Sequence, residues 1–378
     1  MKFLHIADLH IGKTLNDVSF LPDQEHILSQ IVQIAEEENT DAVLIAGDVY
    51  QRSNPSAEAM AIFDKFLTKL VQIGQKVFII SGNHDSSERI SYFSSLIRTS
   101  GVYVSESFTG TLQKVRLTDE GGAIDICLLP FLRPSSARRF FPDKEISDYK
   151  DAVQAALMST PIDPSVRNIA LCHQFITGGE ISDSEEISIG TLEQIPSSLF
   201  DSFDYTALGH LHKPQKISKD TLRYAGSPLK YSFSEIGHKK SAAIVSMPKK
   251  GETEISLRPL HPLRDMRMVK GSFSDLMNEK PSQDYIWAVV TDEIVAPDAK
   301  LDLTAVFPNM LKFTVENSRT KADCDVDISS QGLENKSVNE LFIDFYRLLN
   351  GGQTPTDMHM QVLSDVLSRL EGKTHEAD

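Results

Sequence analysis

Short runs of apolar, often β-branched residues alternate with longer amphipathic stretches from residue 1 to about residue 258. This alternation is typical of an α/β domain, in which buried strands and covering helices follow one another along the chain. Two amphipathic stretches place their apolar residues at helical spacing and predict helices at 22–38 and 56–72. Five apolar runs predict buried strands at 3–7, 42–46, 76–81, 168–172 and 205–208.

The pattern changes after Pro262. Strand-like runs at 285–290 and 311–315 flank a predicted helix at 299–305, and another apolar segment contains Met268 and Val269. These elements predict a small second α/β domain. We therefore expect a large domain over residues 1–260 and a second domain over 261–334.

The last part of the chain has the pattern of two helices. Ser337 and Glu340 form a Ser-x-x-Glu capping box at the start of the first, whose apolar residues recur at helical spacing. The second is predicted to begin with Thr354 as its cap and Pro355 in its first turn. We expect these C-terminal helices over 335–371 and a disordered tail over 372–378. Their apolar faces either pack on their own domain or dock on a partner.

The charge balance bears on possible partners. The 378 residues include 53 acidic and 38 basic side chains, for a net charge of −15. Such a surface keeps a protein soluble but repels polyanions. Any contact with nucleic acid must therefore rest on bound cations, on local basic clusters or on a second subunit.

The cysteines and the N-terminus indicate a cellular compartment. Cys127, Cys172 and Cys324 are widely spaced and form no Cys-x-x-Cys pair, which is typical of unpaired thiols in a reducing compartment. The N-terminus lacks a basic stretch followed by an apolar segment, and the chain has no apolar run of about 18 residues. We expect a soluble, cytoplasmic protein without a membrane segment.

Metal-capable side chains follow each of the five predicted strands immediately. Ligands of α/β sheets gather at the carboxyl ends of the strands, so these side chains are expected to meet. Two pairs are spaced by two residues, which lets both members project to the same side of an extended segment. The side chains concerned are Asp8, His10, Asp48, Asn83, His84, Asp85, His173, His210 and His212.

Each of these short motifs has a purely structural reading when it is taken alone. An Asp-x-His at a strand end is usually a turn or a histidine that hydrogen-bonds within the fold, and a single Gly-Asp means less still. The complete set in one domain favours a metal site. Carboxylate, imidazole and amide donors without thiolates suit Mn²⁺ or a similar divalent ion rather than structural zinc. A carboxylate shared by two ions, about 3.5–4 Å apart, would allow phosphate-ester hydrolysis without a nucleophilic side chain.

Five sequence strings resemble the motifs of calcineurin-like metallophosphoesterases. They are DLH at 8–10, GDVY at 47–50, GNHD at 82–85, CHQ at 172–174 and GHLH at 209–212. More narrowly, DLHIGKTL near the start, PFLRP at 130–134 and YAGSPLKYSFSE at 224–235 are similar to the SbcD family of nuclease subunits. The resemblance covers nearly the whole chain. It implies a metallophosphoesterase β-sandwich flanked by helices, a small α/β cap domain that binds DNA, and C-terminal helices.

The resemblance also implies roles for the metal-capable residues. One ion is expected to be bound by Asp8, His10, Asp48 and His212, and the other by Asp48, Asn83, His173 and His210, with Asp48 as the bridge. His84 is expected to lie beside the scissile phosphate and to stabilise or protonate the leaving oxygen, with Asp85 orienting it. The alternative for His84 is a packing role away from the substrate.

One position departs from the family pattern. Relatives often have a histidine three residues after the bridging aspartate, where this chain has Gln51. A role of that histidine in exonucleolytic cutting cannot be transferred. Because a glutamine still donates a hydrogen bond, we expect altered rather than abolished activity.

The resemblance implies a nuclease of DNA repair, recombination and replication. It would be an Mn²⁺-dependent exonuclease on double-stranded ends and an endonuclease on single strands and hairpins, associated with the nucleoid. Its expected partner is an SbcC-type ATPase, on whose coiled coil the terminal helices would dock. A homodimer within a heterotetramer is also implied, through helices near 56–72 or 87–100.

Eight basic residues lie in short clusters and are candidates for contacts with DNA. Any of them is equally well explained as a solvated surface charge. The candidates are Arg133, Arg138, Arg139, Lys213, Lys239, Lys240, Arg264 and Arg267.

Three other functions compete with the nuclease. A phosphoprotein phosphatase is disfavoured because such enzymes continue the second motif with Asp-Arg-Gly and have GNHE as the third, whereas this chain has GDVYQRSNPS and GNHD. A hydrolase of small phosphodiesters is the main alternative, although it has no evident need for a cap and terminal helices. A scaffold without catalysis would show gaps in the ligand set, and this set has none.

Overall fold

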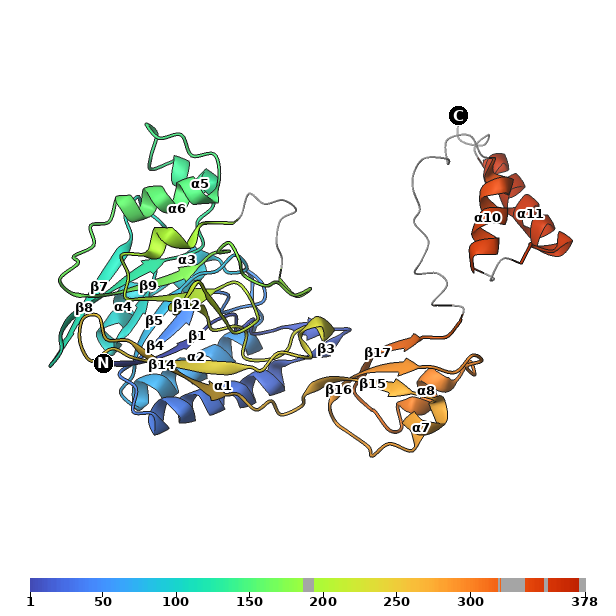
Figure 1. The fold of residues 1–378 in the computed structure, drawn as a ribbon, viewed down its shortest axis with the longest axis horizontal. Helices are drawn as coiled ribbons and strands as arrows, with labels where there is room; N and C mark the ends of the chain where they lie inside the picture. Colours follow the sequence, from blue (N-terminus) through green and yellow to red (C-terminus); the bar gives the residue numbers. More distant parts are fainter. Residues whose placement is uncertain (186–193, 319, 321–336, 350–352, 374–378) are drawn as a thin grey trace. The chain divides into compact units, whose positions relative to one another are not determined.

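The computed structural model describes residues 1–185, 194–318, 320, 337–349 and 353–373 (Figure 1). It divides into two compact units, Met1–Met266 and Arg267–Asp378. The division falls a few residues beyond the expected end of the large domain at residue 260. Cys127 and Cys172 are buried free thiols, and Cys324 lies outside the described residues.

Two six-stranded sheets form the first unit. The first sheet has the order β14-β13-β1-β4-β5-β6 and comprises β1 (Lys2–Ile6), β4 (Ala42–Ala46), β5 (Lys76–Ile80), β6 (Val102–Val104), β13 (Ser241–Ser246) and β14 (Glu254–Pro259). The second has the order β11-β12-β10-β9-β8-β7 and comprises β7 (Gln113–Asp119), β8 (Gly122–Leu129), β9 (Arg167–His173), β10 (Tyr205–Gly209), β11 (Gln215–Ile217) and β12 (Lys219–Tyr224). The short strands β2 (Thr14–Leu15) and β3 (Val18–Ser19) pair separately.

The two sheets pack face to face over a shared core. Alternate residues of the first sheet, such as Leu44 and Phe78, join Ile126, Leu171 and Ala207 of the second in one buried cluster. Both central strand sets are parallel, β1-β4-β5 in one sheet and β8-β9-β10 in the other. The residues between them, which face the other side of each sheet, are buried as well. The central strands are therefore largely apolar at every position and do not alternate between apolar and polar residues.

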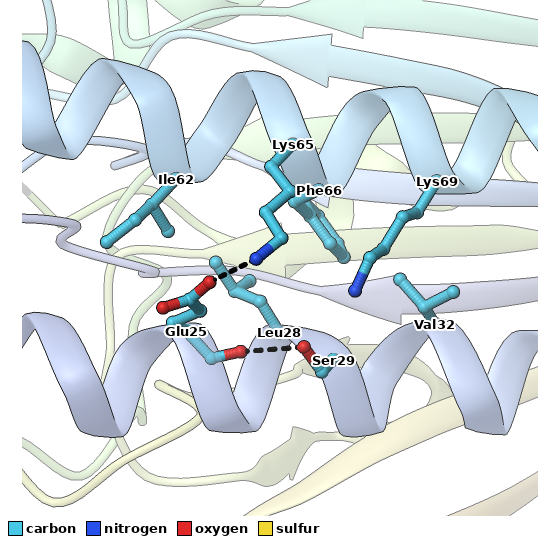
Figure 2. A pocket seen from close by; sticks show the side chains of 8 residues that line it. All are labelled: Glu25, Leu28, Ser29, Val32, Ile62, Lys65, Phe66 and Lys69. Carbon is cyan, nitrogen blue, oxygen red and sulfur yellow. Dashed lines mark hydrogen bonds and ion pairs between the residues drawn. The ribbon is translucent and has the colours of Figure 1, made fainter.

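Helices cover the outer faces of this sandwich (Figure 1). Helices α1 (Leu21–Glu37) and α2 (Ala57–Gln72) pack together beneath the first sheet, and Figure 2 shows the ion pair of Glu25 with Lys65 across their exposed seam. Ser56 caps α2 by accepting from Ala59 N–H. Helices α5 (Pro134–Arg138) and α6 (Tyr149–Met158) lie against the second sheet. The remaining elements are α3 (Ser87–Ile90), α4 (Ser94–Ile97) and the 3-10 turns Arg98–Ser100, Ser197–Phe200 and Phe233–Glu235.

The second unit contains a three-stranded sheet with the order β15-β16-β17. Its strands are Met266–Gly271, Tyr285–Val290 and Met310–Val315, and its helices are α7 (Phe273–Met277) and α8 (Ala299–Leu303). Ile286, Ala288 and Val290 project from the central strand into a core with Leu303 and Phe307. This small α/β domain agrees with the sequence pattern.

Two helices follow in the same unit, α10 (Val338–Leu349) and α11 (Asp357–Lys373). The predicted capping box is present, since Glu340 N–H donates to Ser337 Oγ and Ser337 N–H donates to Glu340 Oε2. The prediction that Thr354 caps the second helix was wrong. The helix begins at Asp357, and Thr356 is the residue directly before it. The carbonyl of Thr356 accepts the first helical hydrogen bond, from the N–H of Met360.

Two further observations concern this end of the chain. Helix α11 extends to Lys373, into the expected tail at 372–378, and residues 374–378 lie outside the described residues. None of the helices in the described part of the chain combines the length and the apolar run needed to span a bilayer.

A buried arginine provides a test of the sandwich. Arg167 is 1% exposed and pairs with Asp119, whose pKa is held below its usual range by that guanidinium. We expect Asp119→Asn to lower the free energy of unfolding by about 3–5 kcal/mol, because it leaves a buried charge unpaired. A lowered carboxyl pKa stabilises the fold at neutral pH and less so as pH falls below about 4, so the variant should also lose part of its acid sensitivity. Urea unfolding at pH 7 and pH 2 measures both effects; equal stability of the two proteins at pH 7 would contradict them.

Candidate metal centre

The predicted ligands converge where five strands end. Asp8 and His10 follow β1, Asp48 follows β4 and Asn83 follows β5, all in the first sheet. From the second sheet come His173 at the end of β9, and His210 and His212 after β10. Both sheets therefore contribute ligands, and the site lies at the edge where their parallel strands terminate.

Asp48 occupies the centre of this group. Its Oδ2 is 3.6 Å from Nε2 of His10, 3.4 Å from Nε2 of His173 and 3.9 Å from Nε2 of His84. The same carboxylate accepts the His84 backbone N–H at its other oxygen. One carboxylate thus faces histidines from both halves of the site, as a bridging ligand must.

The remaining ligands fall into two groups on either side of Asp48. On one side, Nε2 of His10 and Nε2 of His212 are 3.0 Å apart, and a ligand oxygen of Asp8 lies within 4.8 Å of both rings. On the other side, Asn83 Oδ1 is 3.1 Å from His173 Nε2 and 3.1 Å from His210 Nδ1. The structure thereby brings together the side chains of all seven predicted ligands around Asp48, and Asp8 also lies near His173, with Oδ1 4.0 Å from Nδ1.

The hydrogen-bond pattern around His173 fits a cation. Its Nδ1 lies 2.8 Å from the carbonyl of Ala46 and must donate to it, which leaves Nε2 with a lone pair in the neutral ring. That lone pair faces Asn83 Oδ1 and Asp48 Oδ2, which are acceptors as well. Three converging acceptors are satisfied by a positive ion, and oxygen and imidazole donors suit a first-row divalent metal.

Charge and burial act strongly on the same residues. Burial lowers the pKa of His173, but the carboxylates of Asp48 and Asp8 outweigh it and raise that pKa to about 9. Burial raises the pKa of Asp8 to about 7, and burial together with the charge of His173 lowers the pKa of His210 to about 3. These shifts show a pocket that needs positive charge beside its carboxylates. A divalent ion supplies that charge in place of a proton.

Four of the ligands have a left-handed backbone. The φ angles are 53° at Asp8, 45° at His10, 47° at Asp48 and 107° at His210. Such conformations are strained in residues other than glycine and are retained where the surroundings enforce them. At His10 one such group is Gln24, whose amide donates to the carbonyl of His10 at 2.7 Å, and the N–H of Asp8 donates to the carbonyl of Gly47 at 3.1 Å.

Two glycines allow the strand ends to approach this closely. A Cβ on Gly209 would lie 1.8 Å from the carbonyl oxygen of Ala46 and 2.8 Å from Nδ1 of His173. A Cβ on Gly82 would lie 2.0 Å from Oδ1 of Asp48. The glycines of the GHLH and GNHD strings are therefore required by close packing against the ligands.

His84 lies at the rim of the centre. Its ring packs edge-on against His10 at 4.8 Å between centroids, and its Nδ1 is 3.2 Å from the carbonyl oxygen of Gln51. Donation from Nδ1 to that carbonyl leaves Nε2 directed toward Asp48. Because a backbone carbonyl makes this contact, it does not depend on the side chain at position 51, where relatives often have histidine.

Asp85 connects two loops of the centre. Its carboxylate accepts N–H groups of Val49 at 3.1 Å, Tyr50 at 3.0 Å and Gly82 at 2.9 Å. These bonds join the loop after β4 to the loop after β5. Asp85 therefore ties together the backbone segments that contain Asp48 and His84, and its role in orienting the His84 ring stays a prediction.

Sequence reasoning missed a second layer of residues around the ligands. The ring of Phe131 stacks over His210 with centroids 6.0 Å apart, and the guanidinium of Arg133 lies over the ring of Phe131. Ser184 and Glu235 surround His212. The strings at 130–134 and 224–235 contain Phe131 and Glu235, but only the fold shows which ligand each contacts.

The structure also corrects the set of candidate DNA contacts. Lys240 is buried at 7% exposure and bonded to Glu235, so it is unavailable to phosphate. Arg264 forms a two-point ion pair with the buried Asp23, which occupies its guanidinium. The other six candidates are at least partly exposed, although Lys213 pairs with Glu180 and Arg267 with Asp284 at the surface.

Comparison with known proteins agrees with this geometry. The family model described as calcineurin-like phosphoesterase matches residues 1–214, more than half of the chain. The SbcD component of nuclease SbcCD from Staphylococcus epidermidis is 32% identical over 379 residues, which cover 98% of each chain. The chain belongs to the SbcD family of calcineurin-like phosphoesterases. A second family model, described as type 5 capsule protein repressor C-terminal domain, matches residues 262–349 of this SbcD-family chain.

Solved structures with a similar fold have distant sequences. A dimetal phosphatase from Danio rerio is 12% identical, with a TM-score of 0.40 over 69% of this chain and 96% of its own. Yfce, a phosphoesterase from E. coli, is 12% identical, with a TM-score of 0.28 over 69% of this chain and 100% of its own. With scores this low, the family assignment rests on the sequence matches.

The close packing at Gly209 yields a prediction. We expect Gly209→Ala to destabilise the protein by about 1–3 kcal/mol or more and to weaken Mn²⁺ binding, because the new methyl group meets a backbone carbonyl and the ring of His173. Gly237→Ala is the matched control, since a Cβ there meets nothing within 4 Å. Thermal unfolding and calorimetric Mn²⁺ titration measure both effects. Wild-type melting and metal binding in Gly209→Ala would contradict the geometry.

Proposed function

We propose that this chain is the nuclease component of an SbcCD-type complex and hydrolyses phosphodiester bonds of DNA. The observation that carries the proposal is the carboxylate of Asp48 between two sets of imidazole, amide and carboxylate donors. The name of the Staphylococcus epidermidis relative, a nuclease component matched over 98% of both chains, supports DNA as the substrate.

The residues that would hold the metals follow from the geometry. Asp8, His10 and His212 would bind one ion, and Asn83, His173 and His210 the other, with Asp48 shared. The donor set contains no thiolate, which favours Mn²⁺. Two such ions, when bound by these residues, would supply positive charge for the phosphate oxygens and would lower the pKa of the attacking water.

His84 is the proposed general acid. Its Nδ1 is held by the carbonyl of Gln51, so the ring can turn only its Nε2 toward a phosphate at the centre. A protonated Nε2 donates to the leaving oxygen as the ester bond breaks, and the proton then remains on the released hydroxyl. The bonds of Asp85 to Val49, Tyr50 and Gly82 keep the His84 loop at a fixed distance from Asp48.

DNA contacts are proposed at the basic residues that remain accessible. Arg133 lies beside the centre through its contact with Phe131, and Lys213 directly follows the ligand His212. With a net charge of −15, the chain offers few such groups, so the bound ions and the partner protein are expected to provide much of the affinity. The remaining candidates are Arg138, Arg139, Lys239 and Arg267.

The terminal helices are the proposed docking site for an SbcC-type coiled coil. Phe345 of α10 is 57% exposed, and Val362 and Val366 of α11 are 58% and 48% exposed. Apolar side chains at helical spacing that remain this exposed are typical of a face that binds another helix.

A homodimer is proposed through the segment 87–97. Tyr92, Phe93 and Leu96 are 70%, 61% and 67% exposed, and they adjoin a groove of about 510 Å³ that α2 also lines with Met60 and Phe63. An exposed apolar cluster beside such a groove is typical of a surface that is self-complementary across a twofold axis.

The nuclease proposal is tested on the protein alone. Chelator-stripped protein should cut a labelled hairpin DNA when Mn²⁺ is added, and His84→Ala should cut it about 10²- to 10⁴-fold more slowly because the general acid is lost. His26→Ala, at an exposed position of α1, is the matched control. Failure of the wild type to cut, even with an SbcC-type partner and ATP, would refute the nuclease; cleavage of only a chromogenic phosphodiester would favour a hydrolase of small phosphodiesters.

The dimer proposal predicts a change in mass. Phe93→Glu should shift the protein from dimer to monomer in sedimentation equilibrium, because it buries a charge without a partner at the interface. Its melting temperature should stay close to that of the wild type, since Phe93 is 61% exposed within one chain. A wild type that sediments as a monomer would refute this interface.

A further inference from the structure

His212 is held by side chains on the face opposite the metal. Its Nε2 faces His10, while its Nδ1 lies 2.7 Å from the hydroxyl of Ser184 and 3.5 Å from Oε1 of Glu235. For Nε2 to offer a lone pair to an ion, the ring proton must reside on Nδ1. The groups around Nδ1 therefore decide whether this ring is ready to bind metal.

The hydroxyl proton of Ser184 determines which ring nitrogen of His212 is protonated. Its Oγ is 2.5 Å from Oε1 of Glu235 as well as 2.7 Å from Nδ1 of His212. An ionised carboxylate can only accept, so the hydroxyl donates to Glu235 and its oxygen is left as an acceptor. His212 must then donate from Nδ1 to Ser184, which places the lone pair on Nε2.

A buried ion pair keeps Glu235 charged. Glu235 is fully buried, and Nζ of Lys240 is 2.5 Å from its Oε2. The ammonium of Lys240 also donates to Ser227 Oγ at 2.7 Å and to the carbonyl of His212 at 2.8 Å, so each of its three protons has an acceptor. Lys240 thus holds the backbone carbonyl of His212 and also Glu235, the carboxylate that accepts the Ser184 hydroxyl.

The segment that contains Ser184 is fixed to the same place by its neighbour. One oxygen of Glu185 accepts the His212 N–H at 2.6 Å, and the other accepts the N–H of Ser182 at 2.5 Å. Two adjacent residues, Ser184 and Glu185, thus bond to one metal ligand, at its ring and at its backbone.

The other half of the centre uses a different device. There the Nδ1 proton of His173 is held by the backbone carbonyl of Ala46, which no substitution removes. At His212 the same task is performed by a hydroxyl and a carboxylate. A mutation of the side chains behind His212 can therefore change one half of the centre without changing the hydrogen bond of His173 in the other half.

We propose that Ser184, oriented by the ion-paired Glu235, is a positioning residue that fixes His212 in its Nδ1–H tautomer and so sets the affinity of the Asp8, His10 and His212 half-site for its ion. Hydrogen-bond partners of ligand histidines typically change metal affinity by about 10- to 100-fold. The inference rests on the proposed two-metal function and assigns a role to Ser184, which lies outside the family strings, and to Glu235, the last residue of the string at 224–235.

The test is a Mn²⁺ titration of the full chain by calorimetry after chelation. Wild type should bind two ions, and Ser184→Ala should bind one of them about 10- to 100-fold more weakly while the other is unchanged. Ser184→Thr, which retains the hydroxyl, should restore the binding. Glu235→Gln should resemble Ser184→Ala, provided that its melting curve shows a folded protein. Glu25→Gln is the control, since Glu25 also pairs with a lysine but at the exposed seam of α1 and α2 (Figure 2).

A second readout needs no metal. Long-range ¹H–¹⁵N spectra of the metal-free protein should show His212 protonated at Nδ1 in the wild type and shifted toward Nε2 protonation in Ser184→Ala. Two ions bound equally well by wild type and Ser184→Ala, with an unchanged tautomer, would overturn the positioning role and leave the nuclease proposal standing. A wild type that binds no divalent ion would overturn both.

Discussion

The approach of two sheets to one carboxylate is the constraint on which the structure depends. Asp48 ends a strand of the first sheet, yet its Oδ2 lies 3.4 Å from a histidine at the end of a strand in the second sheet. The sandwich must therefore bring both sets of strand ends to the same edge with little tolerance. The buried cluster that joins Leu44 and Phe78 to Ile126 and Leu171 fixes this spacing, because a closely packed core cannot shift without opening voids.

Holding the ligands in place requires local conformations that oppose the general preferences of the chain. A left-handed backbone costs roughly 1–2 kcal/mol in residues other than glycine, and Asp8, His10, Asp48 and His210 all have one. Hydrogen bonds from side chains to the backbone offset this strain. Gln24 bonds to the carbonyl of His10, and Asp85 bonds to the N–H groups that follow Asp48. Residues outside the predicted ligand set thus hold the geometry of the predicted ligands.

The sequence allowed prediction of whatever depends on local pattern. The strand Ala42–Ala46 and the ligands directly after it could be predicted because an apolar run and the polar residues at its end are neighbours in the chain. Partners that are distant in sequence could not be predicted. Asp85 adjoins His84 in sequence, but its carboxylate bonds to backbone groups of another loop, more than thirty residues earlier. Threonine is a common helix cap, so Thr354 was a reasonable candidate, but the helix begins after Thr356. The capping preference is met by either threonine, so the sequence alone does not select the first residue of the helix.

Contacts between residues distant in sequence also explain why basic clusters in the sequence predict more accessible positive charge than the folded protein has. Lys240 adjoins Lys239 in sequence, but in the fold it neutralises Glu235 behind His212, and Arg264 neutralises Asp23. Arg167 is likewise bound to Asp119. Each of these cations is paired with an acidic group of the protein itself and is lost to any ligand outside. In a chain with an excess of 15 acidic groups, the proposed function would require positive charge for a phosphate backbone to come chiefly from ions bound near Asp48 and from a partner. Lys240 is unavailable to phosphate, but by holding Glu235 and the backbone of His212 it supports the site where that metal charge would be bound.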